Sequence, residues 1–104
     1  MNDYFVSEDL LKELEEIPES SIVSKTIHKD GDLKAILFGF APGEELSEHT
    51  AAQPAVVHFL QGEARVTLGN DQMKLGSGGW AYMPANMPHS IAAIDKVVMM
   101  LLLV

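Results

Sequence analysis

Residues 43–62 read Gly-Glu-Glu-Leu-Ser-Glu-His-Thr-Ala-Ala-Gln-Pro-Ala-Val-Val-His-Phe-Leu-Gln-Gly, and this stretch decides the fold. Its pattern is that of a loop, a short polar edge and then an apolar strand that stops at a glycine. His49 stands where the loop passes into the first strand. A second stretch led by a glycine, residues 78–89, ends on another histidine, His89. The rest of the chain reads as the sheet that brings these two histidines together.

Short strands separated by turns fill the chain on both sides of this stretch. Besides those of the stretch itself, the expected strands are residues 22–29, 33–41, 64–68, 72–75, 80–83, 90–94 and 97–104. The turns between them are rich in glycine, proline, asparagine and aspartate. About nine short strands at regular spacing, with no helical period after residue 18, are typical of an antiparallel sandwich or barrel. We therefore predict an all-β protein.

The first 20 residues differ from the rest in charge and in period. They hold seven acids and one base, which accounts for −6 of the net charge of −8. Ser7 is the expected cap of a short helix over residues 8–16, which carries one apolar stripe and ends before Pro18. We expect two parts, an acidic helix with its lead-in at residues 1–20 and a β-barrel at residues 21–104.

Composition and charge argue against several classes of partner and compartment. The chain of 104 residues contains no cysteine, so it has neither disulfides nor thiolate metal ligands. Its negative charge would repel phosphate backbones, so we expect no nucleic-acid partner. The longest apolar run has eight residues, against the roughly 20 that a membrane-spanning helix needs. Because no secretion signal is evident either, we expect a soluble cytoplasmic protein with no membrane partner.

The apolar run at the end of the chain points to self-association. Residues 97–104 read Val-Val-Met-Met-Leu-Leu-Leu-Val, with too little polar alternation for a strand that faces water on one side. A homodimer would bury the extra face. The N-terminal helix could instead cover part of that face, which is the competing explanation.

The glycine-led stretches resemble the two sequence motifs of the cupins, a family of small jelly-roll barrels. The first cupin motif is Gly, five residues, His, one residue, His, three or four residues, Glu, six residues, Gly. This chain matches its spacing without a gap from Gly43 through His49 to Gly62. Ala51 stands in place of the second histidine and Ala55 in place of the glutamate.

The second motif of the family is Gly, five residues, Pro, one residue, Gly, two residues, His, three residues, Asn. Here it runs from Gly78 through Pro84 to His89, with Asn86 in place of the glycine and Ala93 in place of the last asparagine. The fifteen residues between the motifs equal the short spacer of small microbial cupins, and a group of these also carries His-Thr-Ala at this position. The resemblance implies a double-stranded β-helix, or jelly-roll barrel, with a short N-terminal helix.

The resemblance also implies a site, for which three interpretations stay open. Metal-binding cupins usually present three histidines and one glutamate, of which only His49 and His89 remain here. The pair could hold one divalent ion weakly (zinc, nickel, iron or manganese), with Gln53 and water completing the shell. It could equally bind a small ligand without metal, or serve the structure through hydrogen bonds to backbone carbonyls. Strand parity opposes His58 as a further ligand, because Val57 and Phe59 would face inward, unless a bulge changes the parity.

Two functions are compatible with these residues. The barrel mouth near the histidines is the expected pocket, and the lining we predict is His49, Gln53, His89, Phe38, Phe40, Val57 and Phe59. A binding protein for a small, mostly apolar molecule is favoured, because the two motifs supply no glutamate and only two ligands for chemistry. The alternative is a metal-dependent enzyme of the dioxygenase or isomerase type, built on a reduced two-histidine site; the same barrel hosts both.

Overall fold

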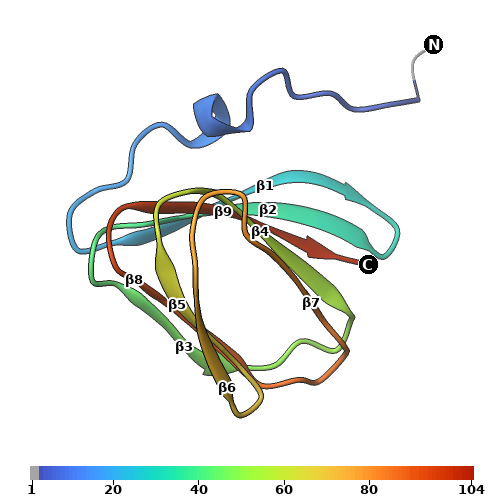
Figure 1. Ribbon diagram of the computed structural model, residues 1–104. Helices are drawn as coiled ribbons and strands as arrows, with labels where there is room; N and C mark the ends of the chain where they lie inside the picture. The colour runs from blue at the N-terminus through green and yellow to red at the C-terminus, as the bar shows by residue number, and fades with distance from the viewer. Residues whose placement is uncertain (1–2) are drawn as a thin grey trace.

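The computed structural model describes residues 3–104, and this part of the chain holds one short helical turn followed by nine strands (Figure 1). The turn, η1, spans Leu10–Leu14. The strands are β1 (Ile22–Asp30), β2 (Leu33–Phe40), β3 (Glu45–His49), β4 (Ala55–Gln61), β5 (Ala64–Leu68), β6 (Asp71–Leu75), β7 (Trp80–Met83), β8 (His89–Ala93) and β9 (Val97–Leu103). The prediction of an all-β protein is confirmed.

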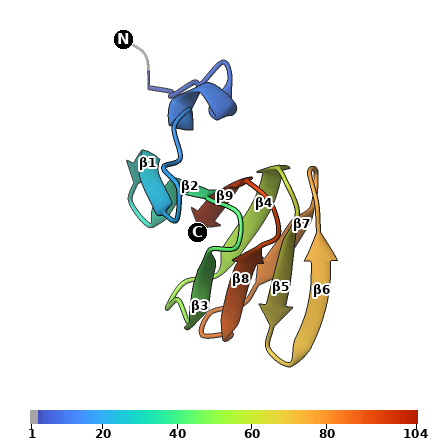
Figure 2. The same cartoon turned by 90° about the vertical axis from the view of Figure 1, so that its left-hand side faces the viewer.

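The strands form two antiparallel sheets that enclose one interior. The five-stranded sheet has the order β1-β2-β9-β4-β7 and the four-stranded sheet the order β3-β8-β5-β6 (Figure 2). Strands that are neighbours in sequence repeatedly cross between the sheets, so β9 lies between β2 and β4. This is the double-sheet arrangement of a jelly roll, as predicted.

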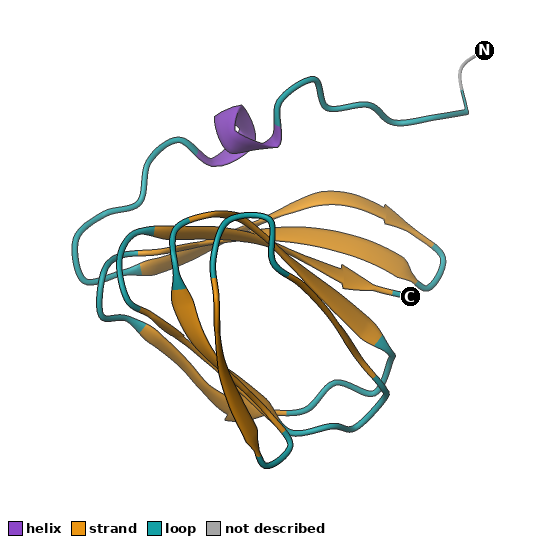
Figure 3. Cartoon of the chain, in the orientation of Figure 1, coloured by secondary structure: helices purple, strands orange, loops and turns teal. Residues whose placement is uncertain are grey.

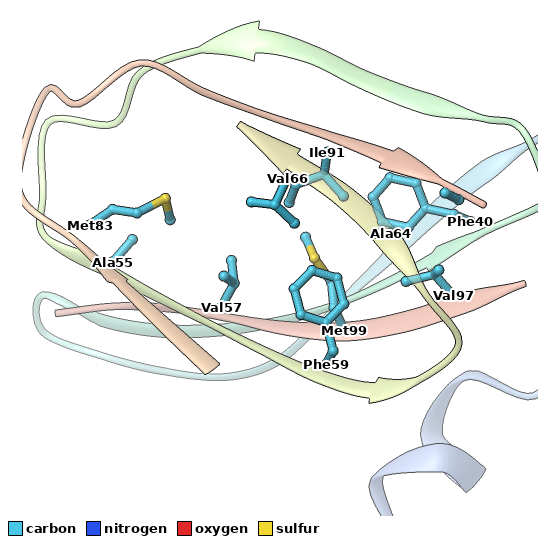
Figure 4. Close-up of a cluster of buried hydrophobic side chains, with 11 residues drawn as sticks. Phe40, Ala55, Val57, Phe59, Ala64, Val66, Met83, Ile91, Val97 and Met99 are labelled. Carbon is cyan, nitrogen blue, oxygen red and sulfur yellow. The ribbon is translucent and has the colours of Figure 1, made fainter. Parts of the chain in front are cut away.

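Alternating side chains on the facing sheets fill the interior. On β4, Ala55, Val57 and Phe59 are at most 1% exposed and belong to the main core cluster, whereas the residues between them are only half-buried. Figure 4 shows the cluster spread along the barrel, with Ala55 and Met83 toward one end. Because a strand has a period of two, each such strand devotes one face to the core.

The N-terminal helix is shorter than predicted and differently capped. The expected helix over residues 8–16 is a single 3₁₀ turn, Leu10–Leu14, and its cap is Asp9, whose carboxylate accepts a hydrogen bond from the Leu11 N–H. The prediction of a Ser7 cap is therefore wrong; the Ser7 hydroxyl donates to Glu13 instead. Glu15 and Glu16 would place negative charge at the negative end of a longer helix, which opposes its extension.

The segment of residues 3–20 lies over the outer face of the five-stranded sheet, above β1 and β2 (Figure 3). Ile17 and Leu14 come so close to Gly39 that a Cβ there would lie 2.7 Å from Ile17 and 3.1 Å from Leu14. Glu13 forms an ion pair of 3.1 Å with Lys25 of β1. Hydrogen bonds from Lys25 and Ser7 lower the pKa of the Glu13 carboxyl. The apolar contacts and the ion pair fix the segment to this half of the sheet.

Within residues 3–104, no helix is long and apolar enough to cross a membrane.

Candidate functional site

A bulge in β3 turns His49 toward the interior. Leu46 is paired with Ile91 of β8, and His49 is paired with His89, so three steps on β3 span two on β8. Leu46 packs against the core cluster. In a regular strand the residue three positions later would face the opposite side. The extra residue between Leu46 and His49 corrects the parity and re-aims the imidazole, as bulges near functional sites do.

His89 is held inside the barrel by its place on β8. It lies two residues before Ile91, a core residue, and therefore on the same face of the strand. Its side chain is 4% exposed, which makes it the one polar residue among the buried residues of the part of the chain described here. On its other side His89 is paired with Leu68 of β5. A nearly buried imidazole between two strands has little freedom to turn away.

The two imidazoles lie against each other. Their ring centroids are 4.1 Å apart and the rings are inclined by 59°. The expectation that the two glycine-led stretches bring His49 and His89 together is met. Two rings in contact at this distance can present nitrogen atoms to one small group bound at the edge of the pair.

Both imidazoles are oriented in the same way by backbone carbonyls. His49 Nδ1 lies 2.8 Å from the Ser47 carbonyl oxygen, and His89 Nδ1 lies 3.0 Å from that of Met87. A carbonyl oxygen can only accept, so each Nδ1 carries the proton and donates. The Nε2 atom of each neutral ring is then an acceptor, available to a hydrogen-bond donor or to a cation.

Two connecting loops meet at the end of the barrel where the histidines lie. The Asn86 N–H donates to the Ala51 carbonyl at 2.7 Å, which joins the β7–β8 loop to the β3–β4 loop. The Gly69 N–H donates to the Pro88 carbonyl at 2.8 Å and ties in the β5–β6 turn. Asn86 has φ = 67°. These bonds fix the backbone on which His89 is mounted.

Gln53 is placed in the loop before β4 and faces the β1–β2 turn. Its side-chain nitrogen donates to the Asp32 carbonyl at 2.7 Å. Its amide is thus held at the edge of the barrel. His58 is only half-buried and stands outside the core cluster, while Val57 and Phe59 face inward. The outward orientation that strand parity predicts for His58 is therefore confirmed.

The predicted apolar lining is spread along the barrel. Phe40, Val57 and Phe59 are at most 1% exposed, and Phe38 is half-buried against the same cluster. Figure 4 shows Phe40 with Ala64 and Val97, far from Met83 and Ala55. Met83 and Ala55 mark the end at which β7 stops and β4 begins, the end that carries the two joined loops. The structure therefore places Phe40 toward the opposite end of the barrel from the histidines.

Sequence reasoning missed apolar residues nearer the histidines. Strand pairing puts Leu68 beside His89, and the same end of the barrel carries Leu46, Met83 and Met87, all in or against the core cluster. The pairing of β5 with β8, which is not readable from motif spacing, is what brings Leu68 to the site.

A shallow hollow of about 500 Å³ lies elsewhere, in the N-terminal segment. Its lining is confined to one run of sequence, Val6, Ser7, Glu8, Asp9, Lys12 and Glu13. The segment forms this hollow with its own side chains, so the hollow is separate from the barrel interior.

The sequence matches the family model described as "Cupin domain" over residues 36–104, which is most of the chain. The chain belongs to the cupin family. The match begins within β2 and covers both histidines and all the loops at their end of the barrel. No curated protein matches the sequence.

Solved structures with the same fold cover most of this chain. A cupin superfamily protein from Desulfitobacterium hafniense is 28% identical, with a TM-score of 0.84, over 90% of this chain and 86% of that one. A conserved protein of unknown function from Streptococcus pyogenes is 27% identical, with a TM-score of 0.85, over 99% and 90%. A Cupin 2 conserved barrel domain protein from Leptotrichia buccalis is 33% identical over 90% of this chain, with a TM-score of 0.83, and this chain spans 46% of its length.

The donor atoms at the histidine pair do not fit a metal held firmly by the protein. Structural and catalytic zinc sites use three or four protein ligands, and this cupin offers two imidazoles. Among residues 3–104, no group of three or more His, Cys, Asp or Glu side chains is placed to share an ion. Nor does any buried side-chain nitrogen or oxygen in that range lack a hydrogen-bond partner.

Proposed function

We propose that this cupin binds a small, mostly apolar molecule at the end of the barrel that carries His49 and His89. The observation that supports the proposal is the matched orientation of the two imidazoles. Each donates Nδ1–H to a carbonyl two residues earlier in the chain, and the rings stand 4.1 Å apart. Two acceptor nitrogens among apolar side chains suit a ligand with an apolar body and a hydroxyl or N–H group.

The surroundings set the ligand's polarity. Leu46, Leu68, Met83 and Met87 contribute only apolar side chains, and His89 is nearly buried. A charged ligand would lose its hydration without gaining an ion pair from any of these residues, which is costly. A neutral ligand needs only a donor for the Nε2 atoms. The cytoplasm, where small neutral metabolites are available, is the compartment we propose for it.

Matched pairs of probe molecules test this proposal. Phenol and toluene have similar shapes, as do cyclohexanol and methylcyclohexane, but only the alcohols donate a hydrogen bond. We expect the alcohols to shift the ¹⁵N resonances of His49 and His89 and to bind about tenfold more tightly than their hydrocarbon partners, the effect of one well-made hydrogen bond.

His89→Phe should remove this preference while keeping the interior filled, and His58→Gln, on the outer face, should leave it intact. Probe binding that ignores the hydroxyl, or that persists with the same preference in His89→Phe, would contradict the proposal.

The second candidate is a metal-dependent enzyme of the dioxygenase or isomerase type, with a divalent ion held loosely by the same two nitrogens. The observation that favours it is that both Nδ1 atoms donate to backbone carbonyls, the second hydrogen bond that metal-ligating histidines make while Nε2 faces the ion. Calorimetric titration with Zn²⁺ and elemental analysis of protein purified without added metal distinguish the candidates. About one equivalent of bound zinc, nickel, iron or manganese would favour the enzyme. Metal-free protein that binds the alcohols would favour the binding protein.

A further inference from the structure

Lys34 stands on the inner face of the five-stranded sheet, at the end of the barrel that carries the histidines. It is paired with Leu103 of β9, and Leu103 is paired with Ala55 of β4 in the same row. Residues paired directly across an antiparallel sheet point to the same side. Leu103 packs against the core cluster and Ala55 belongs to it. The Lys34 side chain therefore leaves β2 on the inner side, at the end where β4 begins.

Burial sets Lys34 apart from the other basic residues. The chain has seven Lys and Arg residues, all within residues 3–104, and Lys34 alone is half-buried while the other six are exposed. Lysine is seldom withdrawn from water unless it has a partner. Lys29 of β1 is paired directly with Lys34, so two positive charges stand opposite each other on one face. Like charges in this position destabilise a sheet.

Neither of these two lysines has a carboxylate that would offset the repulsion. In the part of the chain that the structure describes, the ion pairs are those of Lys25 with Glu13 and of Lys74 with Glu63. The whole chain is acidic, with a net charge of −8, so the lysine pair is a local exception. A half-buried ammonium group beside a second positive charge is well placed to bind an anion.

Hydrogen bonds join the turn between the two lysines to the loops at the histidine end. The Gln53 side chain, in the β3–β4 loop, donates to the Asp32 carbonyl in the β1–β2 turn. The Ala51 carbonyl of the same loop accepts from the Asn86 N–H in the β7–β8 loop. Figure 1 shows the β1–β2 turn and the beginning of β4 on the same side of the barrel opening. The lysines and the histidines therefore stand on one continuous rim.

Strand spacing sets the length of a ligand that could bridge this rim. Lys34 lies two strands away from Ala55, which places their Cα atoms about 10 Å apart. The flexible four-carbon stem of lysine lets its ammonium group reach over part of this span. A molecule that extends from the histidine pair to Lys34 is thus about 8–10 Å long, the length of one ring with a short side chain.

We propose that the ligand is a hydroxylated carboxylic acid whose ring lies among the apolar side chains, whose hydroxyl donates to the imidazoles and whose carboxylate pairs with Lys34, assisted by Lys29. The inference rests on the proposed function and adds an anionic group to the ligand. The carboxylate stays at the rim, in contact with water, so it avoids the cost of burying a charge deeper in the barrel. Lys34 supplies the ion pair that the apolar residues there cannot.

Four probe molecules separate the two ends of such a ligand. The compounds 3-(4-hydroxyphenyl)propanoate and its amide have the same shape and differ in charge, and 3-phenylpropanoate and its amide lack the hydroxyl. We expect NMR titration to show that each carboxylate binds at least about tenfold more tightly than its amide, the effect of one charge-assisted hydrogen bond. This preference should weaken as the salt concentration rises, because ions screen the lysine charges.

Lys34→Met keeps the length of the side chain and removes its charge. It should abolish the preference for the carboxylates and leave the hydroxyl preference of the two amides intact. Lys34→Arg should retain the carboxylate preference, since a guanidinium group also pairs with a carboxylate. Lys96→Met is the matched control, because it removes the same charge from an exposed position in the β8–β9 turn. Circular dichroism checks that each variant is folded, and Lys34→Gln replaces Lys34→Met if that variant is not.

The outcomes distinguish this inference from the proposed function. Equal binding of carboxylates and amides, or the same loss in Lys34→Met and Lys96→Met, would overturn the inference, while a hydroxyl preference among the amides would still support the proposed function. If no probe binds, the proposed function fails and the inference fails with it. A carboxylate preference that depends on Lys34, without any hydroxyl preference, would support the anion site and contradict the part assigned to the histidines.

Discussion

At the scale of single residues, Asn86 shows how this cupin departs from its family motif without losing the structure. The second motif has glycine at this position, and the φ of 67° explains why. Asparagine is among the few other residues that adopt this left-handed conformation at small cost. Its N–H holds the Ala51 carbonyl at the rim of the site. The substitution thus keeps the turn that positions His89.

We predict that Asn86→Val lowers the free energy of unfolding by about 1–2 kcal/mol, because a β-branched residue is strained at this positive φ. Asn86→Gly, the family's own residue, should cost less than about 0.5 kcal/mol. Urea unfolding of the three proteins measures the difference. Equal stability of the valine and glycine variants would mean that the loop adopts another conformation.

The missing metal ligands give a second prediction at this scale. Ala55 is 1% exposed at the start of β4, and Ala51 lies in the loop bonded to Asn86. Ala51→His with Ala55→Glu would add a nitrogen and a carboxylate, so that four protein ligands replace two. We expect the double variant to bind Zn²⁺ at least about a hundredfold more tightly than the parent in calorimetric titration.

Without metal the double variant should be less stable than the parent, because Ala55→Glu buries an unpaired carboxylate. The single variant Ala51→His is the control, with an intermediate affinity. Failure of a folded double variant to bind zinc would show that Ala51 and Ala55 do not face the histidine pair.

At the scale of elements, β3 marks the limit of what the sequence could predict. Motif spacing located His49 correctly, but strand parity alone would have turned it away from the core, three residues after the inward Leu46. The bulge that resolves this is a property of how β3 pairs with β8, and residues 45–49 carry no glycine to signal it. Parity succeeded on β4, where residues 55–59 pair regularly.

The N-terminal segment illustrates a different limit. Its leucine stripe suggested a regular helix, but Leu14 and Ile17 instead pack on β2 at Gly39, where the absence of a side chain leaves room for them. That contact joins two segments that are distant in the sequence, so the periodicity of one segment cannot predict it. The ion pair of Glu13 with Lys25 then fixes the position of the turn.

This ion pair predicts a pH dependence of the segment's attachment. Lys25 and Ser7 lower the pKa of Glu13 in the folded protein. The stability that the Glu13 carboxylate contributes is therefore fully present above its unfolded pKa of about 4.3, and it is lost as the pH falls through the folded pKa. We expect the amide resonances of Leu14 and Ile17 to shift toward those of a free segment as the pH falls through the lowered pKa of Glu13. Glu13→Gln should show the shift at neutral pH, whereas the exposed Glu15→Gln should behave as the parent. A parent whose resonances do not change on acidification would rule out this anchor.

At the scale of the whole molecule, the fold followed from the sequence because many weak signals agreed. Strand count, turn residues and two spaced motifs all indicated an antiparallel barrel, and the seven strands predicted by residue range differ from the structure by at most one residue at either end. The residues that line the site were harder to predict from the sequence than the fold. Phe40 was assigned to the pocket by its apolar character, yet it lies toward the far end of the barrel, a matter of strand order rather than of residue type.

The arrangement of the whole chain leads to a last prediction, that the barrel folds without its N-terminal segment. The core cluster is drawn entirely from residues 40–99, so deleting residues 1–18 removes none of it. What is lost is the cover of Leu14 and Ile17 over β2, together with the burial of Leu37 and Val98. Removing the two half-buried side chains and exposing the two beneath them should lower the free energy of unfolding by about 2–4 kcal/mol. Urea unfolding followed by circular dichroism should therefore show a β-protein with a lower midpoint. The double variant Leu14→Ser with Ile17→Ser keeps the segment and should lose a similar amount, since the apolar contacts carry the effect. Loss of the β signal at room temperature after the deletion would mean that the segment is part of the folding unit.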